Sequence, residues 1–202
     1  MSADKNTALL ILAAGNSSRL GQPKQQLRFK GKSLLERAVQ AGLDSPCQST
    51  LVVLGAYHDE ILQHSDLKQA RVLVHQDWKR GMGSSIKAGL REMLNEENPD
   101  QIIIMLCDQP FVDGKLLTRL INKQQETGLG IIASTYGDTV GVPVLFDRRY
   151  FPLLLEMKDP EGAKKTIEKL PEALALVPFE QGSIDIDTAD DYRQLVEKNE
   201  VG

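Results

Sequence analysis

Runs of consecutive apolar residues alternate with amphipathic segments along most of this chain, and this alternation constrains its fold more than any other feature. The apolar runs have the length of strands and lie at residues 9–12, 51–54, 71–74, 102–106 and 130–134. The segments between them have helical spacing, at residues 33–43, 57–64, 84–94 and 113–125. Strands that are apolar throughout are typical of a parallel sheet covered on both faces. We therefore predict an α/β fold with a Rossmann-like, mostly parallel sheet and helices on both faces, in which residues 102–106 form the central strand.

The C-terminal third has a weaker pattern. Residues 142–146 form a short apolar run that contains Pro143, and because proline cannot donate to a sheet ladder, we expect an edge strand there. Helices are predicted at 163–170 and 189–198, with a weak strand at 173–177. No repeat, low-complexity tract or linker interrupts the chain, so residues 1–202 are predicted to form a single domain. Ser33 and Glu36 have the spacing of a capping box at the start of the first helix.

The composition excludes several classes of function. The 202 residues include 24 Lys and Arg against 28 Asp and Glu, a net charge of −4, which provides no basic surface for nucleic acid. No apolar run approaches the roughly 20 residues of a membrane-spanning helix. Cys47 and Cys107 are too few for a disulfide framework or a zinc site, and the polar start of the sequence is unlike a signal peptide. We expect a cytoplasmic protein without nucleic-acid or membrane partners.

The loop after the first strand carries the strongest functional signal. In an open α/β sheet, ligands bind at the carboxyl ends of the strands. Gly15 and Gly21 allow a tight turn, and Arg19 and Lys24 add two positive charges. Further hydrogen-bond donors come from Asn16, Ser17 and Ser18. Backbone amides and cations together can bind phosphate, although a plain strand-to-helix loop with solvated cations would have a similar sequence.

Two familiar phosphate-binding motifs are excluded. The Walker A loop needs a glycine five residues before its Gly-Lys-Ser, and Gly31-Lys32-Ser33 has Gln26 at that position. The dinucleotide motif also fails, because neither Gly15 nor Gly81 begins a complete G-x-G-x-x-G pattern. Any phosphate site in this loop is therefore of another kind.

The loop and several later blocks resemble one family. The loop reads Leu12-Ala-Ala-Gly-x-Ser-x-Arg-Leu-Gly-x-Pro-Lys24, and further blocks follow at 25–27, 31–35, 78–90, 107–110, 141–146 and 185–192. In this order, and over nearly the whole chain, they resemble the nucleotidyltransferases of the MobA-like superfamily, most closely the molybdenum cofactor cytidylyltransferases. The resemblance implies a sheet of the nucleotide-diphospho-sugar transferase type.

Two acidic positions are candidates for metal binding. Asp108 directly follows the predicted central strand, where a carboxylate would suit Mg²⁺ or would cap the next turn. The resemblance implies the metal, with Asp108 and Asp187 as ligands of Mg²⁺ and with Mn²⁺ as an alternative ion. Asp185 remains an alternative to Asp187, because alternation in an extended segment puts both on one face. Thr188 and Asp191 resemble helix-capping residues, and Cys107 is expected to be a small core residue.

The resemblance also implies where the nucleotide binds. Arg19, Lys24 and Asp108 would be catalytic, and the nucleotide would contact Leu12, Ala13, Ala14, Gly15, Ser17, Ser18, Arg19, Lys24, Gly81, Gly83, Ser84, Ser85 and Asp108. The loop at 81–85 could equally be a glycine-rich turn with serine caps. Ala13-Ala14-Gly15 is typical of the cytidylyltransferases, so CTP is the expected substrate. We expect Lys24 to be exposed, so that Lys24→Ala should harm turnover more than folding.

The implied acceptor is molybdopterin carrying its metal, and a molybdenum hydroxylase that takes up the product is a candidate partner. Two departures concern the acceptor. Many relatives have a polar residue in place of Val142, and Lys164 replaces an arginine, which keeps the charge but loses the planar fork. Other readings therefore stay open. They are transfer to a sugar phosphate or methylerythritol phosphate, a non-catalytic molybdopterin carrier, and a Rossmann-like binder of another metabolite.

Overall fold

The computed structural model describes residues 5–67 and 69–200 and contains a seven-stranded sheet in the order β5-β4-β1-β6-β8-β7-β9. The strands are β1 (Thr7–Ala13), β4 (Ser49–Leu54), β5 (Arg71–Val74), β6 (Gln101–Leu106), β7 (Ile131–Tyr136), β8 (Thr139–Asp147) and β9 (Leu174–Pro178). A separate hairpin joins β2 (Arg28–Phe29) to β3 (Lys32–Ser33). The predicted strands are confirmed, and β6 is the central one.

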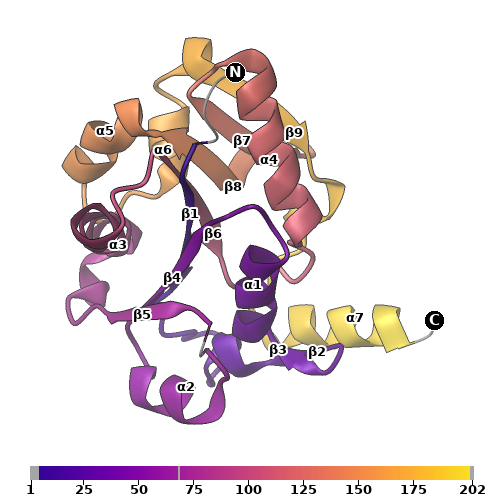
Figure 1. Ribbon diagram of the computed structural model, residues 1–202. Coiled ribbons are helices and arrows are strands. Elements are labelled where there is room, and N and C mark those ends of the chain that lie inside the picture. Colours follow the sequence, from indigo (N-terminus) through magenta and orange to yellow (C-terminus); the bar gives the residue numbers. More distant parts are fainter. Residues whose placement is uncertain (1–4, 68, 201–202) are drawn as a thin grey trace.

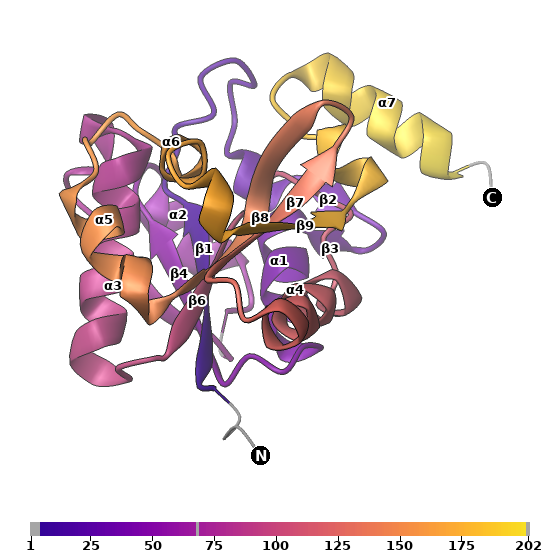
Figure 2. The ribbon, with the colours of Figure 1, turned by 90° about the horizontal axis from the view of Figure 1, so that it is seen from above.

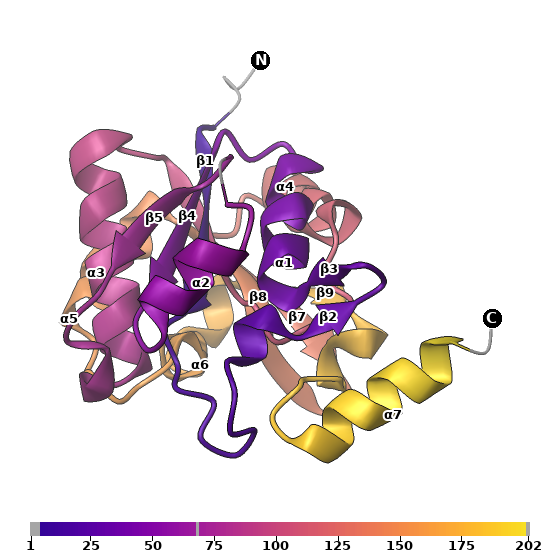
Figure 3. The same ribbon diagram turned by 90° about the horizontal axis from the view of Figure 1, so that it is seen from below.

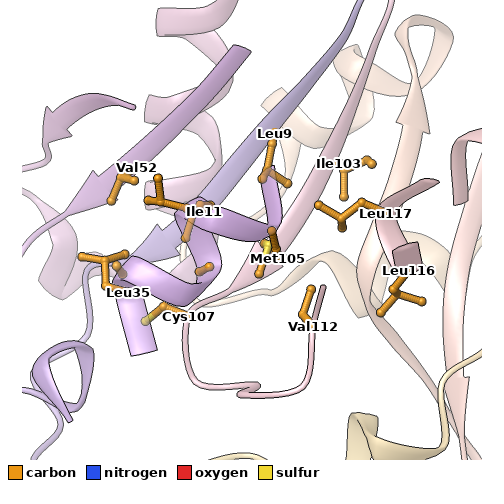
Figure 4. Close-up of a cluster of buried hydrophobic side chains, with 14 of the residues drawn as sticks. Leu9, Ile11, Leu35, Val52, Ile103, Met105, Cys107, Val112, Leu116 and Leu117 are labelled. Atoms are coloured by element: carbon orange, nitrogen blue, oxygen red, sulfur yellow. The ribbon is translucent and has the colours of Figure 1, made fainter. Parts of the chain in front are cut away.

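Helices cover both faces of the sheet (Figures 1 and 2). They are α1 (Leu34–Leu43), α2 (His58–His64), α3 (Met82–Glu96), α4 (Gly114–Thr127), α5 (Phe151–Glu156), α6 (Ala163–Ile167) and α7 (Ala189–Glu200). Alternate strand residues divide between two cores. Leu9 and Ile11 pack toward α1 and α4, as the close-up in Figure 4 shows, whereas Leu10 packs toward α3. This two-layer burial explains why the strands are apolar at every position. The capping box of Ser33 and Glu36 is also confirmed.

The prediction of an edge strand at residues 142–146 is wrong. β8 lies inside the sheet, antiparallel to both β6 and β7. Pro143 is tolerated because the register with β7 shifts between Ala133 and Ser134, which leaves Val142 and Pro143 without a paired residue on β7. Such a bulge is one of the places where a sheet accepts proline. The carbonyl of Pro143 instead accepts a hydrogen bond of 2.7 Å from the Ser134 hydroxyl.

The chain order creates a crevice at one sheet edge. β1 pairs in parallel with β4 on one side and with β6 on the other: the chain runs from β1 to β4 and β5 on one side and then crosses to β6 on the opposite side of β1. The carboxyl ends of β1 and β6 therefore form a topological switch point, which is where open α/β sheets bind ligands. The loop of residues 14–23 follows β1 at this edge.

The C-terminal segment returns to the same edge. Ile186 is fully buried with Leu27, Phe29 and Leu34, so the segment before α7 packs against the β2–β3 hairpin. Figure 3 shows the start of α7 beside the loop that follows β1. This packing brings the residues near position 187 to the end of the central strand. In the described part of the chain, no helix is both long and apolar enough to cross a membrane.

Candidate active site

A cavity of about 360 Å³ lies at the carboxyl ends of β1 and β6. Of the predicted nucleotide contacts, its wall includes Leu12, Ala13, Ala14, Gly15, Lys24, Gly81, Ser85 and Asp108. Trp78, Lys79 and Met82 also line it. The wall is mainly apolar between the strand ends, with Lys24 and Asp108 supplying charge. An apolar cleft with a few convergent polar groups is typical of a small-molecule site.

Lys24 lies between the two predicted metal ligands. Its ammonium is 2.5 Å from Oδ2 of Asp108 and 3.1 Å from Oδ1 of Asp187. Burial opposes the charge, but the neighbouring Asp108 carboxylate outweighs it, and the pKa of Lys24 is raised. Lys24 is therefore a firmly charged counter-ion rather than a solvated side chain. The expectation that it is exposed is wrong, because only 17% of its side chain is accessible.

The second cation of the loop binds the same carboxylate. One guanidinium nitrogen of Arg19 lies 2.7 Å from Oδ2 of Asp187, and two thirds of the Arg19 side chain is exposed. Partial burial raises the pKa of Asp187, but the positive charges of Lys24 and Arg19 outweigh burial and lower it overall. Asp187 thus stays ionised and links the two cations of the loop.

Asp108 is the buried member of the cluster. It is 6% exposed, and within the described residues its Oδ1 has no hydrogen-bond partner. Its backbone carbonyl accepts a 3.0 Å hydrogen bond from the amide of Ile186, which fixes the C-terminal segment beside it. Asp108 lines the cavity, and its buried Oδ1, which has no partner in the described chain, is a group that calls for a compensating contact.

Local hydrogen bonds hold the loop after β1. The Ser17 hydroxyl accepts a 3.0 Å hydrogen bond from the amide of Lys24. Gln25 is fully buried, and its amide group donates to the carbonyls of Ala13 and Gly15. The role of Gln25 was missed by the site prediction. The only sequence feature that pointed to Gln25 was its place in the Gln25-Gln26-Leu27 block. Nothing else in the sequence indicates that this polar side chain is buried.

The residues of the glycine-rich loop differ in their position relative to the cavity. Gly81 and Ser85 line the cavity, but Gly83 and Ser84 do not. A Cβ on Gly81 or Gly83 would collide with the backbone of residues 158–161, so these glycines permit close packing there. The Ser84 hydroxyl donates to the carbonyl of Gly81. Nε2 of His75 lies within hydrogen-bond distance of the same Ser84 hydroxyl. Ser18 is exposed on the loop after β1 and is not part of the cavity wall.

Asp185 lies near Asp108, and Thr188 and Asp191 lie at the start of α7. Burial, together with the negative charges of Asp108 and Asp187, raises the pKa of Asp185. Asp191 accepts hydrogen bonds from the amide and hydroxyl of Thr188, and its amide donates back to that hydroxyl. Thr188 and Asp191 therefore cap α7, as expected. Cys107 is also a core residue, because it is 3% exposed and packs in the cluster with Leu9 and Ile11, and this burial raises the pKa of its thiol to about 12.

A second cavity, of about 300 Å³, adjoins the first across Asp108. Leu106 and Asp108 line both cavities. The other residues of the second wall are Gln109, Tyr136, Thr139, Val142, Gly182, Ser183 and Asp185. Two carboxylates and several neutral donors and acceptors therefore face it. Asp108 is therefore shared by both cavities, whereas Lys24 lines the first alone and Asp187 is in neither wall.

Comparison with known sequences supports a specific family. Residues 9–174 match the family described as MobA-like NTP transferase domain. The chain is 28% identical to nicotine blue oxidoreductase of Paenarthrobacter nicotinovorans, over 93% of this chain and 95% of that protein. It is 29% identical to purine catabolism protein PucB of Bacillus subtilis, over 91% of this chain and 92% of that protein. It is 29% identical to 2-C-methyl-D-erythritol 4-phosphate cytidylyltransferase of Thermotoga neapolitana, over 65% of this chain and 60% of that protein. These names state different activities, so they select no single substrate.

Comparison with solved structures agrees with the fold. The chain superimposes on the crystal structure of Rv0371c from Mycobacterium tuberculosis with a TM-score of 0.80. The two are 28% identical, and the match covers 98% of this chain and 100% of the other. A structure of Rv0371c in complex with manganese matches with a TM-score of 0.76 at 26% identity, over 95% of this chain and 98% of that one.

Proposed function

This chain belongs to the MobA-like NTP transferase family, and from that premise we propose that it transfers CMP from CTP to the phosphate of molybdopterin carrying its metal. The general activity, nucleotidyl transfer, is that of the family. The observation that carries the specific proposal is Asp108, which lines two adjoining cavities and is paired with Lys24, which in turn contacts Asp187. The first cavity would hold the nucleotide and the second the acceptor.

The reaction needs little proton transfer. An ionised oxygen of the acceptor phosphate attacks the α-phosphorus of CTP, a new P–O bond forms, and the bond to the β-phosphate oxygen breaks to release pyrophosphate. Catalysis of this kind depends on positioning and on neutralising charge. Lys24 lines the first cavity, and Arg19 reaches Asp187 from the same loop, so both cations can contact the triphosphate. Buried Asp108, shared by the two walls, marks the boundary at which the two phosphates would meet and would act there through a bound cation.

The donor set fits a divalent metal. Asp108 has a buried oxygen without a partner among the described residues, and Asp187 stays ionised beside it. Mg²⁺ prefers carboxylate and phosphate oxygens together with water, and Mn²⁺ accepts the same ligands. We assign Asp108 and Asp187 as the residues that would hold the ion, and the manganese complex of Rv0371c supports a divalent metal in this fold. When bound, such an ion supplies Lewis-acid polarisation of phosphate oxygens.

The choice of CTP rests on Ala13-Ala14-Gly15, whose residues form the wall of the first cavity. The acceptor proposal rests on the resemblance to the molybdenum cofactor cytidylyltransferases. The second cavity is consistent with a neutral, hydrogen-bonding acceptor body, because its wall offers carboxylates, hydroxyls and an amide. A molybdenum hydroxylase would then be the protein that receives the product.

Pyrophosphate release tests the proposal. The enzyme is incubated with Mg²⁺ and CTP, GTP, ATP or UTP, with and without molybdopterin loaded with molybdate. Release that requires both CTP and the acceptor is the expected result. Asp108→Asn should lower turnover about a hundredfold or more, by loss of preorganised charge at the reacting phosphate. Asp59→Asn is the matched control, because the Asp59 side chain is 96% exposed.

Other outcomes would redirect the assignment. Release with GTP alone would keep nucleotidyl transfer and reject the cytidylyl inference. Release with methylerythritol phosphate in place of molybdopterin would move the acceptor to the activity that the Thermotoga relative's name states. If no nucleotide gave pyrophosphate while molybdopterin still bound, the carrier reading would replace catalysis.

A further inference from the structure

Both cations of the loop after β1 are bound to the carboxylates that the proposed function assigns to a metal. Lys24 contacts Asp108 and Asp187, and Arg19 contacts the other oxygen of Asp187. The proposed function requires these same cations at the triphosphate. These cations therefore have two sets of anionic partners, the carboxylates and the phosphates, and the structure shows the contacts with the carboxylates. The inference below rests on that proposed function.

A divalent ion and the Lys24 ammonium would compete for one position. Lys24 Nζ lies within hydrogen-bond distance of one oxygen from each carboxylate. An ion that used both Asp108 and Asp187 would have to lie between them as well. Like charges a few ångströms apart repel strongly where water is largely excluded, and Asp108 is buried. A metal ion can therefore bind both carboxylates only when the Lys24 ammonium has moved away from them.

We propose that Lys24 is the resident counter-ion of the Asp108–Asp187 pair, and that nucleoside triphosphate draws its ammonium away and thereby opens the metal site. Lys24 is then an exchangeable positioning group with two working states. In the first it neutralises the carboxylates, and in the second it neutralises the phosphates. The nucleotide and the ion consequently bind together, and the ion alone binds weakly.

The loop is built for a side-chain movement of this kind. The Lys24 amide is fixed by Ser17, and the next residue, Gln25, is buried and anchored to the carbonyls of Ala13 and Gly15. The backbone at Lys24 is thus held, while its side chain keeps several rotatable bonds. Lys24 also forms part of the wall of the first cavity, so phosphates bound there are within its reach.

The exchange also accounts for the burial of Asp108 without nucleotide. An uncompensated carboxylate in the position of Asp108 would be costly, because it is removed from water. Lys24 provides the compensating charge, and Arg19 does the same for the more exposed Asp187. The Oδ1 of Asp108 is buried and has no partner in the described chain, so it is not already engaged by another group.

Binding of Mn²⁺ alone, measured by electron paramagnetic resonance without nucleotide or acceptor, tests the exchange. Lys24→Met keeps the length of the side chain and removes its charge, and it should bind Mn²⁺ at least tenfold more tightly than the wild type. Lys24→Arg should bind as weakly as the wild type. Lys165→Met is the matched control, because the same substitution removes a lysine from an exposed pair with Glu168, and it should change affinity by less than threefold. Lys24→Gln replaces Lys24→Met if the methionine variant does not fold.

Three results would overturn the exchange. They are unchanged or weaker Mn²⁺ binding by Lys24→Met, equally tight binding by Lys24→Arg, and persistence of the gain when Asp108→Asn is added to Lys24→Met. The measurement involves no turnover, so its failure is distinct from failure of the proposed function. A tenfold gain in a protein that releases no pyrophosphate would reject the function and keep the exchange.

Discussion

The backbone amide of Ile186 donates a 3.0 Å hydrogen bond to the carbonyl of Asp108, and this one contact joins the C-terminal segment to the end of the central strand. Asp187 follows directly, so its carboxylate meets Lys24 beside Asp108. The two acidic residues are 79 positions apart in the sequence (187 − 108). The site therefore depends on how well the segment before α7 is anchored.

Ile186→Ala tests that anchor. Ile186 is fully buried, and truncating a buried isoleucine costs about 2–5 kcal/mol of folding free energy. We expect a lower Tm and a fall in kcat well beyond the stability effect, since Asp187 loses its fixed position. Leu195→Ala is the control, because Leu195 packs in the same cluster but on α7. Thermal unfolding and pyrophosphate release of both variants give the comparison. If Ile186→Ala and Leu195→Ala lost equal stability and equal kcat, Ile186 would have no special role in positioning Asp187.

Lys24→Ala is now expected to reduce stability as well as turnover. Lys24 is paired with buried Asp108, so the substitution leaves a carboxylate without its counter-ion. We expect a loss of about 1–3 kcal/mol, less than for a fully buried pair because Lys24 keeps some access to water. Urea unfolding at pH 7 measures it. Lys32→Ala, on the exposed hairpin, is the comparison and should change stability by less than about 0.5 kcal/mol. A Lys24→Ala protein as stable as the wild type would contradict the pairing.

Asp185→Asn should stabilise the protein at neutral pH. The folded-state pKa of Asp185 is raised by burial and by the charges of Asp108 and Asp187, so its ionised form is disfavoured on folding. The cost is fully present above the raised pKa and disappears as the pH falls below the unfolded value. The Tm of Asp185→Asn should therefore exceed that of the wild type at pH 7, and the difference should shrink toward pH 3.5. A constant difference across that range would show that ionisation is not the cause.

Asp159→Asn should weaken nucleotide binding more than it slows turnover. Asp159 binds Lys87 at 2.5 Å and Arg80 at 2.6 Å, and it holds residues 158–161 against the loop that contains Gly81. We expect the KM for CTP to rise several-fold with a much smaller change in kcat, because the reacting phosphates lie elsewhere. Lys165→Met, which breaks the exposed pair with Glu168, is the control and should leave both constants unchanged. A fall in kcat at constant KM would refute this role.

Much of the fold follows from local sequence alone. Uniformly apolar runs such as 102–106 predict buried parallel strands, because each residue must face a covered side of the sheet. Ser33 and Glu36 predict a helix start, because their hydrogen bonds span only three residues. The exception is Pro143, which lies inside the sheet instead of at its edge. A register shift opposite the proline makes this possible, and such a shift depends on a neighbouring strand.

The sequence by itself determined the loop of residues 12–24, its two cations and the acidic positions 108 and 187. Only the tertiary structure decided that Lys24 is buried between Asp108 and Asp187, that Gln25 is an internal anchor, and that Gly83 serves backbone packing. The physical reason is the range of the interactions. Strand and cap patterns arise from neighbours along the chain, whereas the charge and burial of Lys24 depend on carboxylates 84 and 163 residues away.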